Sequence, residues 1–486
     1  MLLSTALGLN LSQPMLDFVD IDLGLDFPLY IDPAGFVNPR DEFAEKCRVD
    51  IQDFFDAVLK AIASGDKSKG GELLAALKEP NETHLGVSKL EPDGRGIGKR
   101  QAEQILENLQ NSVAGKTGLL KDLTDVALFV DGVGADKISD MTTNIIRRHL
   151  IEYTQQQFEL HGQQIANNVP TGLLWDTGNG GWIKDAHDRI PIIQGKKILL
   201  VPKRYVRWRG GLQQAAAKYY NHFVTNFIRD EQLATNGELV RVVKTKKTTK
   251  KKVYKKDIKE KFPLRKDFLA DFSATNPAEY KKFRQTLDRF APVGVRTLVE
   301  AHGAQFNETA FSEALIDALD AIPSGRRDAT AYHHLIMGII TYLFYPDLIT
   351  PTLEHDIDDG RKRIDISYAN SSDKGFFKDR KDDAFTQARE VMFECKNYSD
   401  DITNPEIDQM NGRFDHRRGL FGIIVCRTIE DPDLVIKRCR DVFRAQRGMI
   451  FVLSDEDFKA LLSEPALLRR QKLQNLMLGW LREVSK

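Results

Sequence analysis

The chain has 486 residues, of which 42% are apolar and 29% are charged, and its 70 Lys and Arg residues balance 70 Asp and Glu residues. This composition is typical of a folded protein with about three or four domains, and it argues against disorder over most of the length. Because the net charge is zero, the whole-chain charge favours no class of partner, and only local charge can do so.

The four cysteines, Cys47, Cys395, Cys426 and Cys439, are too scattered for a disulfide framework, and no pair has the CxxC spacing of a structural zinc site. No apolar stretch reaches the ~20 residues of a bilayer span, and the start of the chain lacks the basic residues of a signal peptide. We therefore expect a soluble, cytoplasmic protein with no membrane partner.

The first 40 residues alternate apolar and acidic positions and then reach turn signals, which predicts short strands. Between residues 41 and 162 the apolar residues recur at helical spacing, as at Phe54, Val58 and Ile62. The sequence thus predicts a mostly helical N-terminal domain over residues 1–165, with short strands at its start.

Short apolar runs separated by Gly, Asn and Asp predict strands between residues 170 and 210, and residues 211–227 favour a helix. Residues 166–325 are therefore predicted to form a mixed β and helical middle region. Its stretch 241–266 holds 13 Lys or Arg residues against two acidic ones, a local net charge of +11. Two interpretations stay open for this stretch, a solvated loop or linker and an electrostatic guide for a polyanion. Under the second interpretation, Lys250, Lys251 and Lys252 would contact nucleic acid.

One upstream motif, Gly96-Ile97-Gly98 followed by Ala102, resembles the helix-hairpin-helix pattern. In that pattern, backbone N–H groups at a helix N-terminus bind a DNA phosphate. A second Gly-Val-Gly at residues 132–134 hints at a repeat, but Asp136 and Asp140 suit it poorly to phosphate. The alternative, which we favour, is two loops that precede helices.

From about residue 324 the predicted elements become regular. We expect helices near residues 329–344, 406–414 and 433–446, and strands near 351–356, 363–368, 390–396, 420–426 and 449–453. The order α-β-β-β-α-β-α-β predicts a mixed sheet with helices on both faces over residues 326–486. The whole chain is thus expected to be a multidomain α/β and α+β protein.

The candidate catalytic residues lie on two consecutive predicted strands. Asp365 lies within Lys-Arg-Ile-Asp-Ile, and Glu394 and Lys396 lie within Val-Met-Phe-Glu-Cys-Lys. Because side chains alternate along a strand, Glu394 and Lys396 project from one face while Cys395 points into the packing. If the strands pair, Asp365 joins them, and two carboxylates and an ammonium group meet at one end of the sheet. Carboxylates suit Mg²⁺, and a lysine beside them can orient or deprotonate an attacking water.

In this order of elements, Asp365 followed by Glu394-Cys395-Lys396 resembles the PD-(D/E)XK, or restriction-endonuclease-like, nuclease superfamily. The resemblance covers residues 326–486 and implies a Mg²⁺-dependent endonuclease, with Mn²⁺ as a substitute. It assigns Asp365 and Glu394 to metal binding, with the Cys395 backbone carbonyl as a further ligand, and Lys396 to catalysis. Ile364 takes the place of the proline in the first motif, and the 29-residue step to Glu394 leaves room for an insertion, which we expect to be a loop or short helix near the site.

The resemblance also implies supporting residues around this centre. A glutamine in the helix after the motif often supports the site, which points to Gln409; the alternative is a polar helix face. Basic residues nearby can hold phosphates, and the candidates Arg413, Arg417 and Arg418 are otherwise ordinary surface charge. The helix before the first strand often adds a ligand, which points to His333 or His334, and the alternative is that they are structural histidines.

The function expected from this resemblance is a nuclease of a prokaryotic restriction or anti-phage defence system. DNA is favoured over RNA by the habit of the superfamily. The N-terminal region would then serve targeting, sensing or assembly, through a protein partner or a second copy of the chain. The alternative is a nucleic-acid-binding or sensor protein whose nuclease-like domain is inactive.

Overall fold

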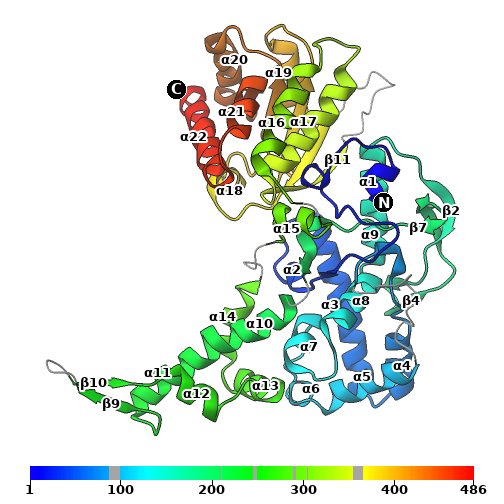
Figure 1. Ribbon diagram of the computed structural model, residues 1–486, viewed down its shortest axis with the longest axis vertical. Coiled ribbons are helices and arrows are strands. Elements are labelled where there is room, and N and C mark those ends of the chain that lie inside the picture. Colours follow the sequence, from blue (N-terminus) through cyan, green and yellow to red (C-terminus); the bar gives the residue numbers. More distant parts are fainter. Residues whose placement is uncertain (87–98, 209–210, 245–248, 288–291, 304, 354–364) are drawn as a thin grey trace.

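A computed structural model describes residues 1–86, 99–208, 211–244, 249–287, 292–303, 305–353 and 365–486 (Figure 1). The fold is mixed α/β, with a mostly helical N-terminal region and a five-stranded sheet near the C-terminus. This confirms the predicted class at that level. Within the described ranges, we find no helix with both the length and the apolar character of a membrane span.

Short strands and longer helices make up the first 208 residues. The helices are α1 (Leu3–Ala6), α2 (Ala34–Val37), α3 (Glu42–Ala63), α4 (Lys67–Ala75), α5 (Lys99–Asn111), α6 (Val113–Lys116), α7 (Leu123–Phe129), α8 (Ala135–Ile145) and α9 (Arg147–Leu160), with the 3₁₀ turns η1 (Gln13–Met15), η2 (Asn81–Thr83) and η3 (Lys203–Tyr205). The strands are β1 (Leu29–Ile31), β2 (Ala166–Pro170), β3 (Leu174–Asp176), β4 (Gly181–Ile183), β5 (His187–Ile190), β6 (Ile192–Ile193), β7 (Lys196–Lys197) and β8 (Val206–Trp208).

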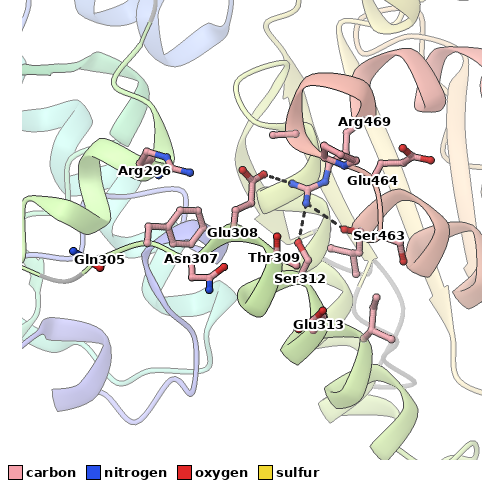
Figure 2. A pocket seen from close by; sticks show the side chains of 15 residues that line it. Arg296, Gln305, Asn307, Glu308, Thr309, Ser312, Glu313, Ser463, Glu464 and Arg469 are labelled. Atoms are coloured by element: carbon pink, nitrogen blue, oxygen red, sulfur yellow. Dashed lines mark hydrogen bonds and ion pairs between the residues drawn. The ribbon is translucent and has the colours of Figure 1, made fainter.

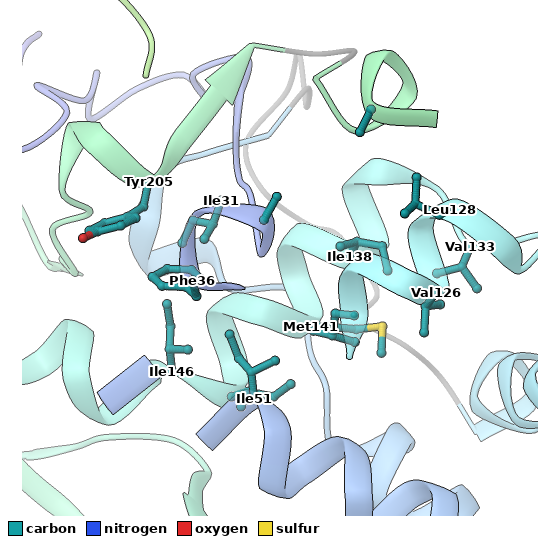
Figure 3. Close-up of a cluster of buried hydrophobic side chains, with 14 of the residues drawn as sticks. Ile31, Phe36, Ile51, Val126, Leu128, Val133, Ile138, Met141, Ile146 and Tyr205 are labelled. Atoms are coloured by element: carbon teal, nitrogen blue, oxygen red, sulfur yellow. The ribbon is translucent and has the colours of Figure 1, made fainter. Parts of the chain in front are cut away.

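One hydrophobic core runs across the boundary that we predicted at residue 165. Strand β1 pairs antiparallel with β8, although more than 170 residues separate them, and both contribute to this core. Phe36 stacks on Tyr205 with ring centroids 4.8 Å apart, and Figure 3 shows both rings near Ile31, with Ile138 and Met141 of α8 in the same cluster. Residues 1–165 and 166–208 therefore share a core.

A long arm follows in the chain. Helix α10 (Gly211–Tyr219) continues through a π-helical turn, η4 (Tyr220–Val224), into α11 (Thr225–Thr235). The strands β9 (Arg241–Lys244) and β10 (Thr249–Lys252) then pair as an antiparallel hairpin, followed by α12 (Lys255–Lys261), α13 (Lys266–Thr275) and α14 (Pro277–Arg284). In Figure 1 this hairpin lies at the far end of the arm from α15 (Val295–Glu300) and the C-terminal sheet.

The arm corrects one of the two interpretations left open for the basic stretch, a solvated loop or linker. Its described residues form a hairpin and the helix α12 rather than irregular chain, and the Val and Thr residues of β9 and β10 favour strands. At its root, Arg284 of α14 forms ion pairs of 2.5 Å with both Asp122 and Asp125 at the start of α7. Charged contacts of this kind, largely shielded from water, tie the arm to the N-terminal core.

The C-terminal core begins earlier than the predicted boundary at residue 326, since α16 (Glu308–Ala321) already contributes Leu315 and Leu319 to it. The further helices are α17 (Ala329–Phe344), α18 (Gly375–Asp382), α19 (Asn404–Asn411), α20 (Pro432–Arg444), α21 (Asp455–Leu462) and α22 (Ala466–Val484). The strands are β11 (Leu348–Leu353), β12 (Asp365–Asn370), β13 (Glu390–Lys396), β14 (Phe421–Cys426) and β15 (Met449–Ser454).

The five strands lie in their chain order, β11-β12-β13-β14-β15. Strand β12 runs antiparallel to both of its neighbours, β11 and β13, whereas β13, β14 and β15 run parallel. Alternate residues of β13 and β14 enter two cores on opposite faces: Cys395 packs with residues of α17, whereas Met392 and Ile424 pack with residues of α19 and α20. The sheet thus has helices on both faces, as predicted from the order of elements.

Helix α18 fills the predicted insertion between β12 and β13, but it lies away from the candidate site. The Asn370 side chain at the end of β12 donates hydrogen bonds to the carbonyls of Phe377 and Ala388, each at 2.8 Å. Phe376 and Phe377 are buried in the core next to α17. Because Asp365 is at the opposite end of β12, the insertion is a packed connection and not part of the site.

Candidate active site

The strand β13 places Glu394 and Lys396 side by side. It is a central strand with β12 on one side and β14 on the other, so its backbone is paired along both edges. Phe393 and Cys395 are buried in the core under α17, and the residues that alternate with them, Glu394 and Lys396, face the other way. The structure therefore confirms the alternation that predicts one shared face for Glu394 and Lys396.

These two side chains form a buried ion pair. The Lys396 ammonium contacts the Glu394 carboxylate and also donates a 3.1 Å hydrogen bond to the Gln409 side-chain oxygen. The exposed fractions of the Glu394 and Lys396 side chains are 0% and 1%. Removing two charges from water is costly unless they are paired, so this contact and the Gln409 amide stabilise the arrangement.

Gln409 reaches the strand because of how α19 begins and packs. Thr403 and Glu406 form a capping box that satisfies free N–H groups of the first turn. Ile407 and Met410 are buried against the sheet, and this orientation turns the Gln409 side chain toward Lys396. The predicted supporting glutamine is thus brought to the lysine.

The three arginines near α19 have different positions. The Arg413 guanidinium lies 3.9 Å from the second Glu394 oxygen and is 17% exposed, so Arg413 belongs to the cluster. Arg418 lies at the other end of β13, where its side chain is 3.8 Å from the Glu390 carboxylate. Arg417 is 92% exposed and contacts Asp415. The structure groups only Arg413 with Glu394, whereas Arg417 and Arg418 line the surface around the start of β13.

The backbone pairing places Asp365 directly opposite Glu394 on the neighbouring antiparallel strand. Residues opposed in this way have Cβ atoms about 4.5–5.5 Å apart and share a face of the sheet. The Asp365 side chain and Ile364 lie outside the described residues. The register therefore brings the first predicted carboxylate residue to the same end of the sheet as Glu394 and Lys396.

Mg²⁺ in proteins commonly takes one or two carboxylates and completes its shell with waters and substrate phosphate. In the described part of the chain, no cluster of three or more His, Cys, Asp or Glu residues could hold a metal ion. Glu394 and Asp365, which lies opposite it in the register, are two acidic residues at one end of the sheet. The Cys395 carbonyl belongs to the same strand, one residue from Glu394.

His333 and His334 lie on α17, which covers the other face of the sheet. His333 is buried with its ring 6.3 Å from the Tyr332 ring. His334 lies beside His161, at the end of α9, where burial and the neighbouring His334 lower the pKa of His161 to about 4. His333 is thus buried, and His334 packs beside the end of another helix, which favours the structural alternative over an auxiliary role at Glu394.

The glycine motifs gain no support as phosphate sites. Residues 96–98 lie outside the described residues, and α8 begins directly after the second Gly-Val-Gly. Burial, followed by the neighbouring Asp136 and Glu79, raises the pKa of the Asp140 carboxyl to about 8. A site with several acidic residues suits phosphate poorly, so a loop that precedes a helix describes the second motif best.

Sequence reasoning missed a groove between the N-terminal helices and the sheet. A cavity of about 290 Å³ is lined on one side by residues of α3 and α9, including Lys46 and His149, and on the other by Ser367, Ala369 and Glu390. The register pairs Ala369 with Glu390 and Asp365 with Glu394, so the groove runs along the sheet face that carries Glu394. No local sequence signal joins these segments, because they are 200 or more residues apart.

Within the groove, His149 forms an ion pair of 2.9 Å with Asp50, and its other ring nitrogen lies 3.7 Å from Glu152. Burial alone lowers the pKa of His149, but the hydrogen bonds to Asp50 and Glu152 outweigh burial and leave it raised. The wall therefore holds a protonated imidazole near neutral pH more readily than a free histidine would.

A larger cavity, of about 730 Å³, lies between α16 and the turn from α21 to α22 (Figure 2). One of its two arginines, Arg469, donates to Glu308 at 2.9 Å, to Ser312 at 2.8 Å and to the carbonyls of Leu461 and Leu462. Because these contacts already engage the guanidinium, we interpret Arg469 as a structural link between α16 and α22.

Comparison with known proteins shows a likeness over the N-terminal part of the chain. Residues 8–212 are similar to a family described as a domain of unknown function, DUF8370. This segment covers the N-terminal core through β8 and ends where the arm begins, so it does not include the C-terminal sheet. No curated protein and no solved structure matches the chain.

Proposed function

We propose that this protein is a Mg²⁺-dependent nuclease that hydrolyses phosphodiester bonds, with its active centre at Glu394, Lys396 and the register position of Asp365. The observation that carries the proposal is the convergence of Lys396, Glu394 and Gln409 on one face of the sheet, with Asp365 paired opposite Glu394. Acidic residues and a lysine at one end of a sheet are the groups that metal-assisted phosphoryl hydrolysis requires.

The sheet supports a restriction-endonuclease-like fold for this domain. Helix α17 is followed by three antiparallel strands, a helix and then a parallel strand, which is the order of elements implied by the PD-(D/E)XK resemblance. The pair Glu394 and Lys396 occupies the third of these strands, as that resemblance requires. We therefore propose the restriction-endonuclease-like fold for this domain together with the nuclease activity.

In the proposed reaction, a water oxygen forms a bond to phosphorus while the bond to the leaving sugar oxygen breaks. Glu394 and Asp365 would hold the Mg²⁺ ion, which when bound polarises the phosphate and lowers the pKa of water. The Lys396 Nζ atom would orient the attacking water and offset charge on the phosphate oxygens. The attacking water releases one proton to solvent, and the leaving oxygen takes one from solvent. Gln409 holds Lys396 in position, and Arg413 lies close enough to contact a phosphate.

A second candidate function, a nucleic-acid-binding protein with an inert nuclease-like domain, is favoured by one specific observation. Glu394 and Lys396 are almost fully buried and paired to each other. A catalytic centre has to admit substrate and water, and an inert centre does not. Measurement of cleavage distinguishes the two candidates.

The test is cleavage of duplex DNA and RNA by the full-length protein, with Mg²⁺, Mn²⁺ or a chelator. We expect metal-dependent cleavage by the natural sequence, and a loss of about 100- to 10,000-fold for Glu394→Gln or Lys396→Met, because each removes a group that acts on the reacting atoms. Matched controls are Asp408→Asn, on the exposed side of α19, and Lys437→Met, on the exposed side of α20, which repeat the same chemical changes away from the site.

Both controls should cleave at the rate of the natural sequence, and circular dichroism should show that all four variants fold. Metal-dependent cleavage that persists in folded Glu394→Gln and Lys396→Met would place the active centre elsewhere. Failure of the natural sequence to cleave any nucleic acid, with any metal, would favour the inert domain.

A further inference from the structure

The hairpin of β9 and β10 is basic on both of its faces. Its register pairs Lys252 with Arg241, Lys251 with Val242, Lys250 with Val243 and Thr249 with Lys244. Residues that are opposite each other in an antiparallel pair point to the same side, and neighbours along a strand point to opposite sides. One face therefore carries Lys250 and Lys252 together with Arg241, and the other carries Lys244 and Lys251.

Apart from the contacts of Arg241 at the base of the hairpin, the described side chains on both faces are largely open to solvent. All four lysines are exposed, and Val242, between Arg241 and Val243, is 57% exposed. A two-stranded hairpin that stands alone is marginally stable in water, and like charges placed close together weaken it further. An exposed ribbon with this charge is therefore an unfavourable element unless a partner neutralises it.

The hairpin is nevertheless held in place at its base. Arg241 forms an ion pair of 2.8 Å with Asp257 of α12, and its guanidinium lies 5.7 Å from the centre of the Tyr254 ring. Val253, directly after β10, is buried, as is Ile258 of α12. The continuous helix formed by α10, η4 and α11 carries this base outward in Figure 1. The ribbon is thus presented by an ordered support rather than by a loose linker.

A flat partner touches one face of a ribbon, whereas a groove touches both. The major groove of B-form DNA is about 12 Å wide and admits a two-stranded β-ribbon, with a phosphate backbone along each wall. The major groove of A-form RNA is deep and too narrow for side chains to enter. Lysines on both faces match the two phosphate walls of the DNA groove.

We infer that the β9–β10 hairpin binds duplex DNA by insertion into the major groove, with Lys250 and Lys252 toward one phosphate backbone and Lys244 and Lys251 toward the other. The arm extends away from the C-terminal sheet, so this contact is separate from the Glu394 cluster. The inference rests on the proposed nuclease function for its biological role. It adds to that function by naming B-form DNA as the nucleic acid that the protein binds. Its test measures binding alone.

The experiment measures binding of the full-length protein to duplex DNA and to duplex RNA of the same sequence, by fluorescence anisotropy, in chelator and at salt concentrations from about 50 to 200 mM. Two double variants each remove one face, Lys250→Gln with Lys252→Gln and Lys244→Gln with Lys251→Gln. The matched control, Lys281→Gln with Lys282→Gln, removes the same charge from exposed positions of α14 on the same arm.

We expect the natural sequence to bind duplex DNA more tightly than duplex RNA. Each face variant should lose roughly 10- to 30-fold in DNA affinity near physiological salt, and the slope of log K against log salt should fall by about 2, because each lysine that neutralises a phosphate contributes about 0.9. The control should keep both its affinity and its slope.

Three results would overturn the inference. Equal affinity for DNA and RNA duplexes would exclude groove insertion, and a loss confined to one face would show docking on a flat partner, such as an acidic protein. Full DNA affinity in both face variants would show that the lysines only protect the edges of the ribbon. DNA binding without metal-dependent cleavage would support this inference and contradict the proposed nuclease activity. Metal-dependent cleavage without hairpin-dependent binding would support the nuclease activity and contradict this inference.

Discussion

Two buried lysines, one in each core region, differ in the atoms that hold them. Lys203, in η3, is fully buried, and its ammonium donates to the backbone carbonyls of Leu16, at 2.5 Å, and Pro14, at 3.4 Å. It also lies 4.3 Å from the centre of the Tyr345 ring. Lys396 is as deeply buried, but its described contacts are with the side chains of Glu394 and Gln409.

This difference separates a structural lysine from a candidate catalytic one. Backbone carbonyls are fixed by the fold, and the contacts of Lys203 tie the η1 turn to η3 and to the segment that enters the C-terminal sheet. A carboxylate such as that of Glu394 is a side-chain group that, under the proposed function, would bind a metal cation. The position of a lysine inside a protein therefore says less about its role than the kind of group that holds it.

The largest expected effect comes from removal of each lysine. Lys203→Met and Lys396→Met should each lower the free energy of unfolding by about 3–5 kcal/mol in chelator, because each leaves a buried carboxylate, Asp17 or Glu394, without its cation. Millimolar Mg²⁺ should restore part of the loss in Lys396→Met only, by about 1.4 kcal/mol when its concentration is ten times the dissociation constant. Urea unfolding with and without Mg²⁺ measures both effects.

The proposed difference between Lys203 and Lys396 is wrong if Mg²⁺ restores stability to both variants or to neither. Rescue of both would indicate a general effect of salt, and CaCl₂ and NaCl at matched ionic strength control for it. Rescue of neither would remove the idea that Glu394 accepts a metal cation, whatever the result of the cleavage assays.

A smaller effect concerns pH and Lys203 alone. Burial lowers the pKa of Lys203 to about 8, and the attraction of Asp17 only partly opposes burial. The unfolded value is near 10.4, so between about pH 8 and pH 10.4 the unfolded chain binds more protons at this lysine than the folded protein does. Stability therefore gains with rising pH across this window. We expect the difference in unfolding free energy between the natural sequence and Lys203→Met to increase from pH 8 to pH 10, and a constant difference would contradict the assignment.

The sequence predicts the strand β13 and the shared face of Glu394 and Lys396, because both depend on local alternation and on a short motif. The same holds for Gln409, whose helix starts with a recognisable Thr-x-x-Glu capping pattern. Local patterns also locate α17 and β15 within a few residues.

Features that depend on distant pairing were not accessible in this way. Strand β11 begins three residues before its predicted start and β12 ends two residues after its predicted end, because Leu348 pairs with Asn370. The burial of Lys203 depends on carbonyls almost 190 residues earlier. His149 likewise meets Asp50 from another helix, 99 residues away. None of these contacts leaves a periodic signal along the chain.

The smallest effect tests whether a single neutral contact holds the candidate catalytic lysine. Gln409→Leu removes the oxygen that accepts from Lys396 at 3.1 Å, whereas Gln409→Glu keeps an oxygen there. One such hydrogen bond contributes about 1 kcal/mol to stability, and a lysine that is no longer held in its productive position should cleave roughly 10-fold more slowly. We therefore expect Gln409→Leu to lower the cleavage rate at saturating DNA with little change in KM, and Gln409→Glu to retain most of the rate. Equal losses in both variants would show that the amide packs the helix and does not position Lys396.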